Sequence, residues 1–262
     1  MSTNGALAGR TAVITGGGRG IGPAVATALA EAGAAVLVAA RSEDQIAAVA
    51  AKLRDEGLQA WSLHCDVADP DSVEALAQGA NERLGKVDIL VNNAGIASGA
   101  PLHRQSLQEW NRIMAVNATG TFLCTKAFAP AMAQRGWGRV VNIASLAART
   151  GARYISAYAA SKHAQLGFTR CIAAEMADRG VTVNAVCPGY VDTDMTTHTI
   201  EQIMAKTGLS EQEALGSILA TTPQRRLIEV EEVAHVTLML CSEAARGING
   251  QAIGIDGGEF LG

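Results

Sequence analysis

The chain has 262 residues, of which 48% are hydrophobic and only 4% aromatic, and its formal net charge is −4. This length suits one large α/β domain, residues 1–262, with a core filled mainly by small aliphatic side chains. A weakly acidic chain gives no electrostatic basis for binding nucleic acid. No apolar run approaches the roughly 20 residues of a membrane span. We therefore expect neither nucleic acid nor a membrane as a partner.

In chain order, predicted strands and helices alternate from end to end. Beginning with a strand, they cover residues 11–15, 21–32, 35–40, 43–56, 60–64, 71–84, 87–92, 107–134, 139–144, 156–179, 181–186, 231–242 and 251–255. Several strands are continuously apolar, which is typical of strands covered on both faces. The alternation requires right-handed crossovers and predicts a single-domain Rossmann fold, a doubly wound seven-stranded parallel sheet flanked by helices.

A glycine-rich turn joins the first strand to the first helix. Gly16, Gly20 and Gly22 fall within the eight residues from Thr15 to Gly22. Glycine permits positive φ and lets the backbone approach phosphates closely, while the start of the following helix receives an anion. The turn therefore predicts a dinucleotide site.

The end of the second strand indicates which dinucleotide is bound. NAD-dependent Rossmann sites place an acidic side chain there to accept the ribose 2′-hydroxyl, whereas this chain has Arg41. Arg41 can pair with a 2′-phosphate, aided by Arg19 in the glycine turn. This favours NADPH/NADP as the cofactor, with NAD as the alternative, and carbonyl reduction as the physiological direction.

Three residues further along indicate the chemistry. Tyr158 and Lys162 are four residues apart on one predicted helix, so their side chains share a face. We expect the Lys162 ammonium to lower the pKa of the phenol from about 10, so that Tyr158 is the general acid in reduction and the base in oxidation. Ser145 follows the fifth strand at the ligand-binding edge, where its hydroxyl can stabilise an oxyanion.

Asn117 is unusual for its place on a helix. Trp110, Ile113 and Met114 form an apolar stripe, and Asn117 falls on this stripe at helical spacing. Burying an unpaired amide costs roughly 1–3 kcal/mol, and Gly120 weakens the same helix by about 1 kcal/mol. We therefore expect a kinked helix in which Asn117 bonds to backbone or water.

One segment departs from the strand–helix alternation. Residues 190–224, which we call the lid segment, follow the sixth strand and Pro188-Gly189, at the edge where open α/β sheets bind ligands. We expect an irregular insertion that acts as a mobile lid over the substrate.

These features together resemble the short-chain dehydrogenase/reductase family over essentially the whole chain. The resemblance rests on the glycine turn, Cys65-Asp66-Val67, Asn92-Asn93-Ala94-Gly95, the Ser145, Tyr158 and Lys162 set, Pro188-Gly189 with Thr193, and Asp256-Gly257-Gly258. It implies that Asp66 contacts the adenine, Asn93 supports the central strand, and Thr193 approaches the nicotinamide. It also implies that Lys162 holds the nicotinamide ribose, that Asn117 binds a relay water, and that the protein is a homotetramer.

The predicted site has three parts and no metal, because the five histidines show no metal-ligand spacing. The catalytic residues are Asn117, Ser145, Tyr158 and Lys162. The cofactor-binding residues are Gly16, Arg19, Gly20, Ile21, Gly22, Arg41, Asp66, Val67, Asn93, Ala94, Gly95, Tyr158, Lys162, Pro188, Gly189, Val191 and Thr193. The substrate residues are Ser145, Ala147, Tyr154, Tyr158, Tyr190 and Met195.

The small and apolar pocket residues indicate an uncharged carbonyl compound: a 3-oxoacyl thioester, a polyketide-type ketone or an aromatic ketone. Bacterial 3-oxoacyl-carrier-protein reductases are similar at residues 190–195, but one of their partner-docking arginines is replaced by Ala174. The 3-hydroxybutyrate dehydrogenases are similar at residues 208–258, but a histidine of their carboxylate clamp is replaced by Ala147.

Two alternatives remain for the activity. One is an NAD-dependent secondary alcohol or 3-hydroxyacyl dehydrogenase, and the other is a catalytically silent dinucleotide-binding sensor. The five cysteines are scattered and odd in number, and residues 1–9 contain no signal sequence, so a cytoplasmic location is expected.

Overall fold

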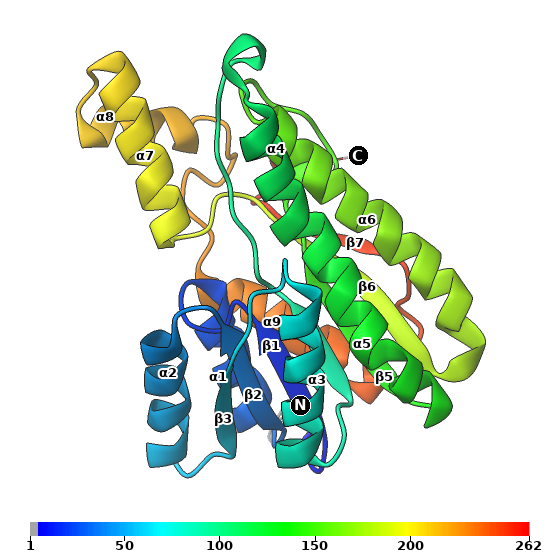
Figure 1. The fold of residues 1–262 in the computed structure, drawn as a ribbon. Helices are drawn as coiled ribbons and strands as arrows, with labels where there is room; N and C mark the ends of the chain where they lie inside the picture. Colours follow the sequence, from blue (N-terminus) through cyan, green and yellow to red (C-terminus); the bar gives the residue numbers. More distant parts are fainter. Residues whose placement is uncertain (1–4, 262) are drawn as a thin grey trace.

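A computed structural model describes residues 5–261, in which seven parallel strands form one sheet (Figure 1). The strand order is β3-β2-β1-β4-β5-β6-β7, so the chain reverses its direction of progress across the sheet between β1 and β4. The strands are β1 Thr11–Thr15, β2 Ala35–Ala40, β3 Ala60–His64, β4 Ile89–Asn92, β5 Gly138–Ile143, β6 Val181–Pro188 and β7 Ala252–Ile255. The predicted doubly wound sheet is confirmed. Residues 1–4 of the N-terminal segment, and residue 262, lie outside the described part.

Helices cover both faces of the sheet because its strands are apolar on both sides. Ile14 of β1 packs with the cluster under one set of helices, and its neighbour Val13 packs with the cluster under the other. The first set is α1 Ile21–Glu31, α2 Glu43–Asp55 and α9 Val230–Cys241, and the second is α3 Pro70–Leu84, α5 Gly120–Gln134 and α6 Ser156–Met176.

The predicted helix at residues 107–134 has a break in its hydrogen-bonding pattern. It consists of α4 Leu107–Met114, a π-helical turn at Ala115–Thr119, and α5. The expected irregularity at Asn117 is thus confirmed as a π-helical turn. A Cβ on Gly120 would lie 2.7 Å from Val67 Cγ2. The glycine that weakens the helix therefore lets α5 approach the loop after β3.

The lid segment is mostly helical, so the expectation of an irregular insertion is wrong. It contains α7 Asp194–Thr207 and α8 Glu211–Leu219. Ser210 and Glu213 form a capping box that satisfies the backbone N–H groups of these two residues at the start of α8. Ile200, Ala214 and Ile218 form a small core of their own between the two helices.

Polar contacts attach the lid segment to the body near both ends of α7. Val191 pairs with Ile228 in an isolated bridge, and Ile228 N donates to Tyr190 O at 2.8 Å. At the other end of α7, Lys206 Nζ donates to Gly99 O at 3.4 Å. Figure 1 shows α7 and α8 standing apart from the sheet and its helical layers, beside the segment that precedes α4.

The remaining helical segments are short 3₁₀ turns, at Leu102–Arg104, Leu146–Ala148, Ala177–Arg179 and Glu243–Ala245. Within residues 5–261, none of the helices combines the length and the apolar character that crossing a membrane requires.

Candidate active site

A cleft of about 800 Å³ opens at the carboxyl ends of the central strands. It is lined by the glycine turn, the loops after β3 and β4, the start of α6, the lid segment, and the C-terminal residues Glu259 and Phe260. Ligand sites typically measure about 300–1,000 Å³, so this cleft has room for a large ligand. Across the described residues, no three His, Cys, Asp or Glu side chains are grouped so that they could hold a metal ion.

The glycine turn fits a dinucleotide pyrophosphate. Gly16 and Gly20 have φ of 64° and 60°, a conformation that favours glycine. A Cβ on Gly16 would lie 2.8 Å from Ala94 Cα, so the turn packs backbone to backbone against the segment after β4. Gly20 is the N-cap of α1 and supplies no side-chain cap. The first N–H groups of α1 are thereby left free of side-chain capping and can bind an anion.

Asn93 holds this turn in place. Its Nδ2 donates to Thr15 O at 3.1 Å and to Gly16 O at 2.9 Å, and its backbone N donates to Thr15 Oγ1 at 3.1 Å. Gly22 packs behind the turn, because a Cβ there would lie 2.3 Å from Gly16 O. Gly22 therefore permits close packing and does not itself line the cleft.

The structure brings most of the predicted site together. Three predicted residues, Gly22, Asn117 and Tyr154, are not part of the cleft lining. The others line it: Gly16, Arg19, Gly20, Ile21, Arg41, Asp66, Val67, Asn93, Ala94, Gly95, Ser145, Ala147, Tyr158, Lys162, Pro188, Gly189, Tyr190, Val191, Thr193 and Met195.

Ser145, Tyr158 and Lys162 meet on the sheet side of the cleft. The side chains of Ser145 and Tyr158 are hydrogen-bonded to each other, and Ser145 Oγ also accepts from Ala147 N at 3.1 Å. Lys162 Nζ lies 5.9 Å from the centroid of the Tyr158 ring. The i, i+4 spacing on α6 therefore places the phenol, the ammonium and the serine hydroxyl in one site, as expected.

The electrostatics of the phenol differ from the expectation. Burial raises the pKa of Tyr158, and the hydrogen bond with Ser145 offsets this only in part. Burial also lowers the pKa of Lys162 to about 8, and its Nζ donates to Ile143 O at 2.9 Å. The expected net lowering of the Tyr158 pKa is therefore wrong for this arrangement, because desolvation outweighs the interactions that favour the phenolate.

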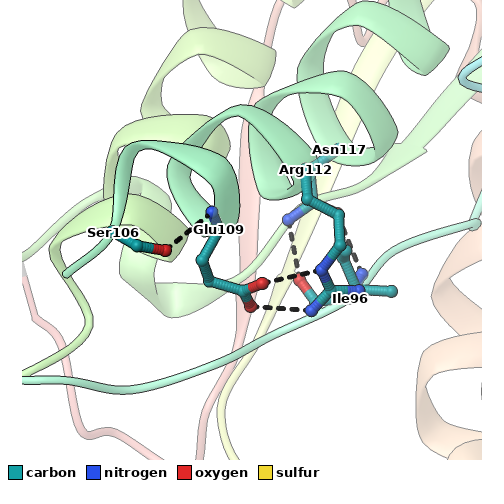
Figure 2. A network of polar contacts seen from close by, with 5 residues as sticks. All are labelled: Ile96, Ser106, Glu109, Arg112 and Asn117. Atoms are coloured by element: carbon teal, nitrogen blue, oxygen red, sulfur yellow. Dashed lines mark hydrogen bonds and ion pairs between the residues drawn. The ribbon is translucent and has the colours of Figure 1, made fainter.

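Asn117 lies behind the cleft and is fully buried in the π-helical turn. Its Oδ1 accepts from Ile96 N and its Nδ2 donates to Ile96 O, each at 2.9 Å (Figure 2). Nδ2 also donates to Ser161 Oγ at 2.9 Å. The amide thus bonds to backbone, as expected, and ties the turn to the segment after β4.

Arg112 lines the cleft beside Ser98, although Arg112 was not predicted to do so. Arg112 donates to both carboxylate oxygens of Glu109, each at 2.7 Å, and Ser106 Oγ accepts from Glu109 N. Figure 2 shows these contacts. The hydrogen bonds from Arg112 and Ser98 lower the pKa of Glu109 to about 2. The i, i+3 spacing predicts this ion pair, but not that Arg112 faces the cleft.

The end of the cleft beside β2, where the adenosine is expected, carries two arginines. Arg41 and Gln45 line it beside β2, and Arg19 lines it from the glycine turn. Arg19 Nη1 lies 3.9 Å from Asp194 Oδ2 at the start of α7, with both side chains largely exposed. Asp66 also lines this end, and its Oδ1 accepts from Ala68 N at 3.0 Å.

The substrate end contains a carboxylate that the predicted site lacks. Glu259 lines the cleft, and its buried Oε2 has no hydrogen-bond partner among the described residues. Its charge contributes to the raised pKa of Tyr190, for which burial is the larger cause. Tyr154, by contrast, is 59% exposed and has φ of 72°. Its carbonyl accepts from Ala100 N at 2.7 Å, so it braces the cleft rim through its backbone.

Comparison with known proteins places this site in context. The family model described as short chain dehydrogenase matches residues 10–203. The chain is 39% identical over 258 residues to the 3-oxoacyl-acyl-carrier-protein reductase of Synechocystis sp., covering 98% of the chain and 99% of that protein. It is 37% identical over 254 residues to the D-beta-hydroxybutyrate dehydrogenase of Rhizobium meliloti, covering 95% and 98%.

A solved structure is also similar over nearly the whole chain. A single-substitution variant of actinorhodin polyketide ketoreductase, crystallised with NADPH, superposes with a TM-score of 0.92 at 37% identity. The match covers 95% of this chain and 97% of that one. The similarity therefore extends over the sheet, both helical layers and nearly the full length of the chain.

Proposed function

The chain belongs to the short chain dehydrogenase family, and we propose that it is an NADPH-dependent carbonyl reductase. It transfers a hydride to a ketone, of the 3-oxoacyl thioester, polyketide or aromatic type, and yields a secondary alcohol. The observation that carries this proposal is the meeting of Ser145, Tyr158 and Lys162 in one cleft with a glycine turn. Membership of the family makes the protein an NAD(P)-dependent oxidoreductase that acts on CH–OH groups.

The end of the cleft beside β2 supports NADPH as the cofactor. Arg41 and Arg19 offer guanidinium groups to a 2′-phosphate, and the glycine turn offers backbone N–H groups to the pyrophosphate. The cofactor supplies the hydride. The actinorhodin ketoreductase, with a TM-score of 0.92, was crystallised with NADPH.

Tyr158 donates the proton that the reduced carbonyl oxygen requires. Its raised pKa keeps the phenol protonated at neutral pH, which is the form a general acid needs for reduction. Ser145 donates a hydrogen bond to the same oxygen and stabilises the negative charge that develops there.

Lys162 holds a positive charge beside the phenol. Because the pKa of Lys162 is about 8, its side chain is in the charged ammonium form in most molecules at neutral pH. This charge favours the phenolate left behind after proton transfer, and the resemblance to the family implies that the ammonium also holds the nicotinamide ribose. Asn117 holds the segment after β4 through its two hydrogen bonds with Ile96. Gly95 of this segment lies close to the side chains of both Asn117 and Lys162, so the segment forms the cleft wall near the ammonium.

The substrate end of the cleft favours an uncharged ketone. Ala147 and Met195 supply apolar surface. The Glu259 carboxylate, whose Oε2 has no hydrogen-bond partner among the described residues, repels a substrate carboxylate. The names of the Synechocystis and actinorhodin proteins refer to reductases of acyl or polyketide carbonyl groups. They support this class over the small hydroxy acid named for the Rhizobium relative.

The test compares cofactors and ketones in one assay. Wild type should oxidise NADPH with an uncharged ketone from a panel of 3-oxoacyl thioesters, polyketide-type and aromatic ketones. Arg41→Ala should lower kcat/KM for NADPH at least tenfold and leave kcat/KM for NADH within about twofold, because one phosphate contact is lost. Lys52→Ala, an exposed cation outside the cleft lining, should change neither value. Selectivity indifferent to Arg41 would remove the phosphate-pairing argument, and no turnover of any ketone would remove the function.

We also propose a homotetramer. Phe122 is 42% exposed on α5 and packs edge-to-face on Phe168 of α6, with ring centroids 6.1 Å apart. Exposed aromatic side chains of this kind favour burial between subunits. Light scattering should give the mass of four chains of 27.0 kDa, whereas a monomeric mass would contradict the proposal.

A further inference from the structure

The ammonium of Lys162 has a second partner that the proposed mechanism leaves unused. Besides Ile143 O at 2.9 Å, Nζ donates to Gln165 Oε1 at 3.2 Å. Gln165 is 1% exposed and Lys162 3% exposed. Lys162 lines the cleft, but Gln165 does not. An amide group is therefore buried directly behind the ammonium, away from any substrate.

The bond from Lys162 starts a chain of hydrogen bonds that crosses to another helix. Gln165 Nε2 donates to Thr121 Oγ1 at 2.8 Å, and Thr121 Oγ1 donates to Asn117 O at 2.9 Å. Thr121 is buried on α5 and Asn117 in the π-helical turn. The ammonium of α6 is thus connected through two side chains to the carbonyl group of a π-helical residue.

The direction of this chain is fixed by chemistry. An ammonium group can only donate, so the amide oxygen of Gln165 must face Lys162 and the NH₂ group must face Thr121. The Thr121 hydroxyl then accepts from the amide and donates onward to Asn117 O. All the dipoles point their negative ends toward Lys162, and chains of this kind strengthen each member bond.

We propose that Gln165 is a positioning residue for Lys162, with Thr121 locking its amide in the orientation that fixes the ammonium and keeps it charged. The inference rests on the proposed function only in the role it gives Lys162. Gln165 touches neither cleft nor substrate, so it acts through the lysine. It offsets part of the cost of burying the ammonium, because a hydrogen bond to a charged group contributes more than one between neutral groups.

Two substitutions at Gln165 separate positioning from mere packing. Gln165→Leu removes the acceptor and disfavours the charged form, so the pKa of Lys162 should fall. Gln165→Glu supplies a carboxylate that favours the charged form, so the pKa should rise. Both substitutions disturb a buried position, yet a packing role alone gives no reason for opposite shifts.

The titration is measured directly in the protein without cofactor, by competitive acetylation with acetic anhydride and mass spectrometry of the peptide that contains Lys162. In wild type the labelling midpoint should lie at about pH 8. The other titratable groups facing the ammonium are Tyr158 on α6 and Cys187 on β6. Burial raises the pKa of both, so they stay neutral through this range.

We expect the midpoint to fall by roughly one pH unit in Gln165→Leu and to rise by roughly one unit in Gln165→Glu. The alkaline limb of kcat/KM should move in the same two directions. The matched control is Thr169→Val, which removes a buried hydroxyl of α6 that is not hydrogen-bonded to Lys162. This hydroxyl accepts from Asn142 Nδ2 and donates to the backbone carbonyl of Gln165. It should leave the midpoint unchanged.

Midpoints that do not move, or that move in the same direction in both Gln165 variants, would overturn the proposal. If Gln165→Leu does not fold, Thr121→Val replaces it, because freeing the amide should lower the midpoint by a smaller amount. A wild type without ketone reductase activity would refute the proposed function, whereas the labelling midpoints would still decide the role of Gln165.

Discussion

Three carboxylates line the cleft, Asp66, Asp194 and Glu259, and Asp66 and Glu259 differ in what holds them. Asp66 Oδ1 accepts a hydrogen bond from Ala68 N at the adenosine end, whereas Glu259 Oε2 has no partner among the described residues. An unpartnered carboxylate oxygen is available to accept a hydrogen bond from a hydroxyl or amine donor, and its charge repels an acid. The charge of Glu259 is therefore the feature that most constrains the substrate.

Glu259→Gln should increase kcat/KM for acetoacetate about twentyfold relative to that for ethyl acetoacetate. A like charge roughly 10 Å away costs about 1.7 kcal/mol at an effective dielectric constant near 20, and the amide removes that cost. Steady-state kinetics with the two compounds measure the ratio. Glu56→Gln, an exposed substitution outside the cleft lining, is the control. An acid-to-ester ratio that is the same in Glu259→Gln and wild type would contradict this role.

The place of a single residue could be predicted where strand ends and helical spacing determine it. Ser145, Tyr158 and Lys162 follow from strand end and helical spacing, and all three line the cleft. Tyr154 was predicted to contact the substrate but lies outside the cleft lining. Nothing in the local sequence shows that its backbone has positive φ and turns the side chain outward. Glu259 was missed because the path of the C-terminal tail depends on tertiary packing.

Two helical glycines, Gly120 and Gly216, differ in whether the packing around them requires a glycine. A Cβ on Gly120 of α5 would lie 2.7 Å from Val67 Cγ2, whereas nothing lies within 4 Å of a Cβ on Gly216 of α8. Both glycines lower helix propensity by the same mechanism. Only the first is required by packing, and its neighbour Val67 lines the cofactor cleft.

Alanine at each position should therefore change the free energy of unfolding in opposite directions. Gly216→Ala should stabilise the protein by about 0.5–1 kcal/mol, because alanine is the better helix former. Gly120→Ala should destabilise it by about 1–3 kcal/mol through overpacking, and should raise KM for the cofactor. Urea unfolding of the two variants beside wild type measures both effects. Equal stabilisation by both would show that the contact with Val67 is unimportant.

The elements themselves were predictable to different degrees. The strands are buried on both faces and stand out as apolar runs, so their ends fall within two residues of the expectation. The lid segment gave a weaker pattern because α7 and α8 bury only a small core of Ile200, Ala214 and Ile218. The capping sequence from Ser210 to Glu213 is the local feature that predicts α8.

Over the whole molecule, buried thiols couple folding to pH. Burial raises the pKa of Cys65 to about 11 and the pKa values of Cys124 and Cys241 to about 12, from 9.0. Above pH 9 the unfolded chain loses these protons while the folded chain keeps them. The stabilisation is thus complete below pH 9 and is lost as pH rises toward 12. Lys162 acts in the opposite sense between about pH 8 and its ordinary value of 10.5.

Cys241→Ala should make the protein less sensitive to alkali. Between pH 9.5 and pH 11, the free energy of unfolding should fall more steeply in wild type than in Cys241→Ala, because the variant lacks one titrating group. The two slopes should differ by up to about 1.4 kcal/mol per pH unit. Urea unfolding across this range gives both slopes. Cys171→Ala, at an exposed thiol, should leave the slope unchanged. Equal slopes in wild type and Cys241→Ala would contradict the linkage.

The most direct measurement is the turnover of Tyr158→Phe beside that of Tyr154→Phe, with NADPH affinity measured by fluorescence titration. Removal of the Tyr158 hydroxyl should lower kcat by about 10²–10⁴-fold, as expected for a lost general acid, and should leave NADPH affinity within about twofold. Tyr154→Phe should match wild type, because that side chain lies outside the cleft lining. Wild-type turnover in Tyr158→Phe would contradict the assignment of Tyr158 as the proton donor.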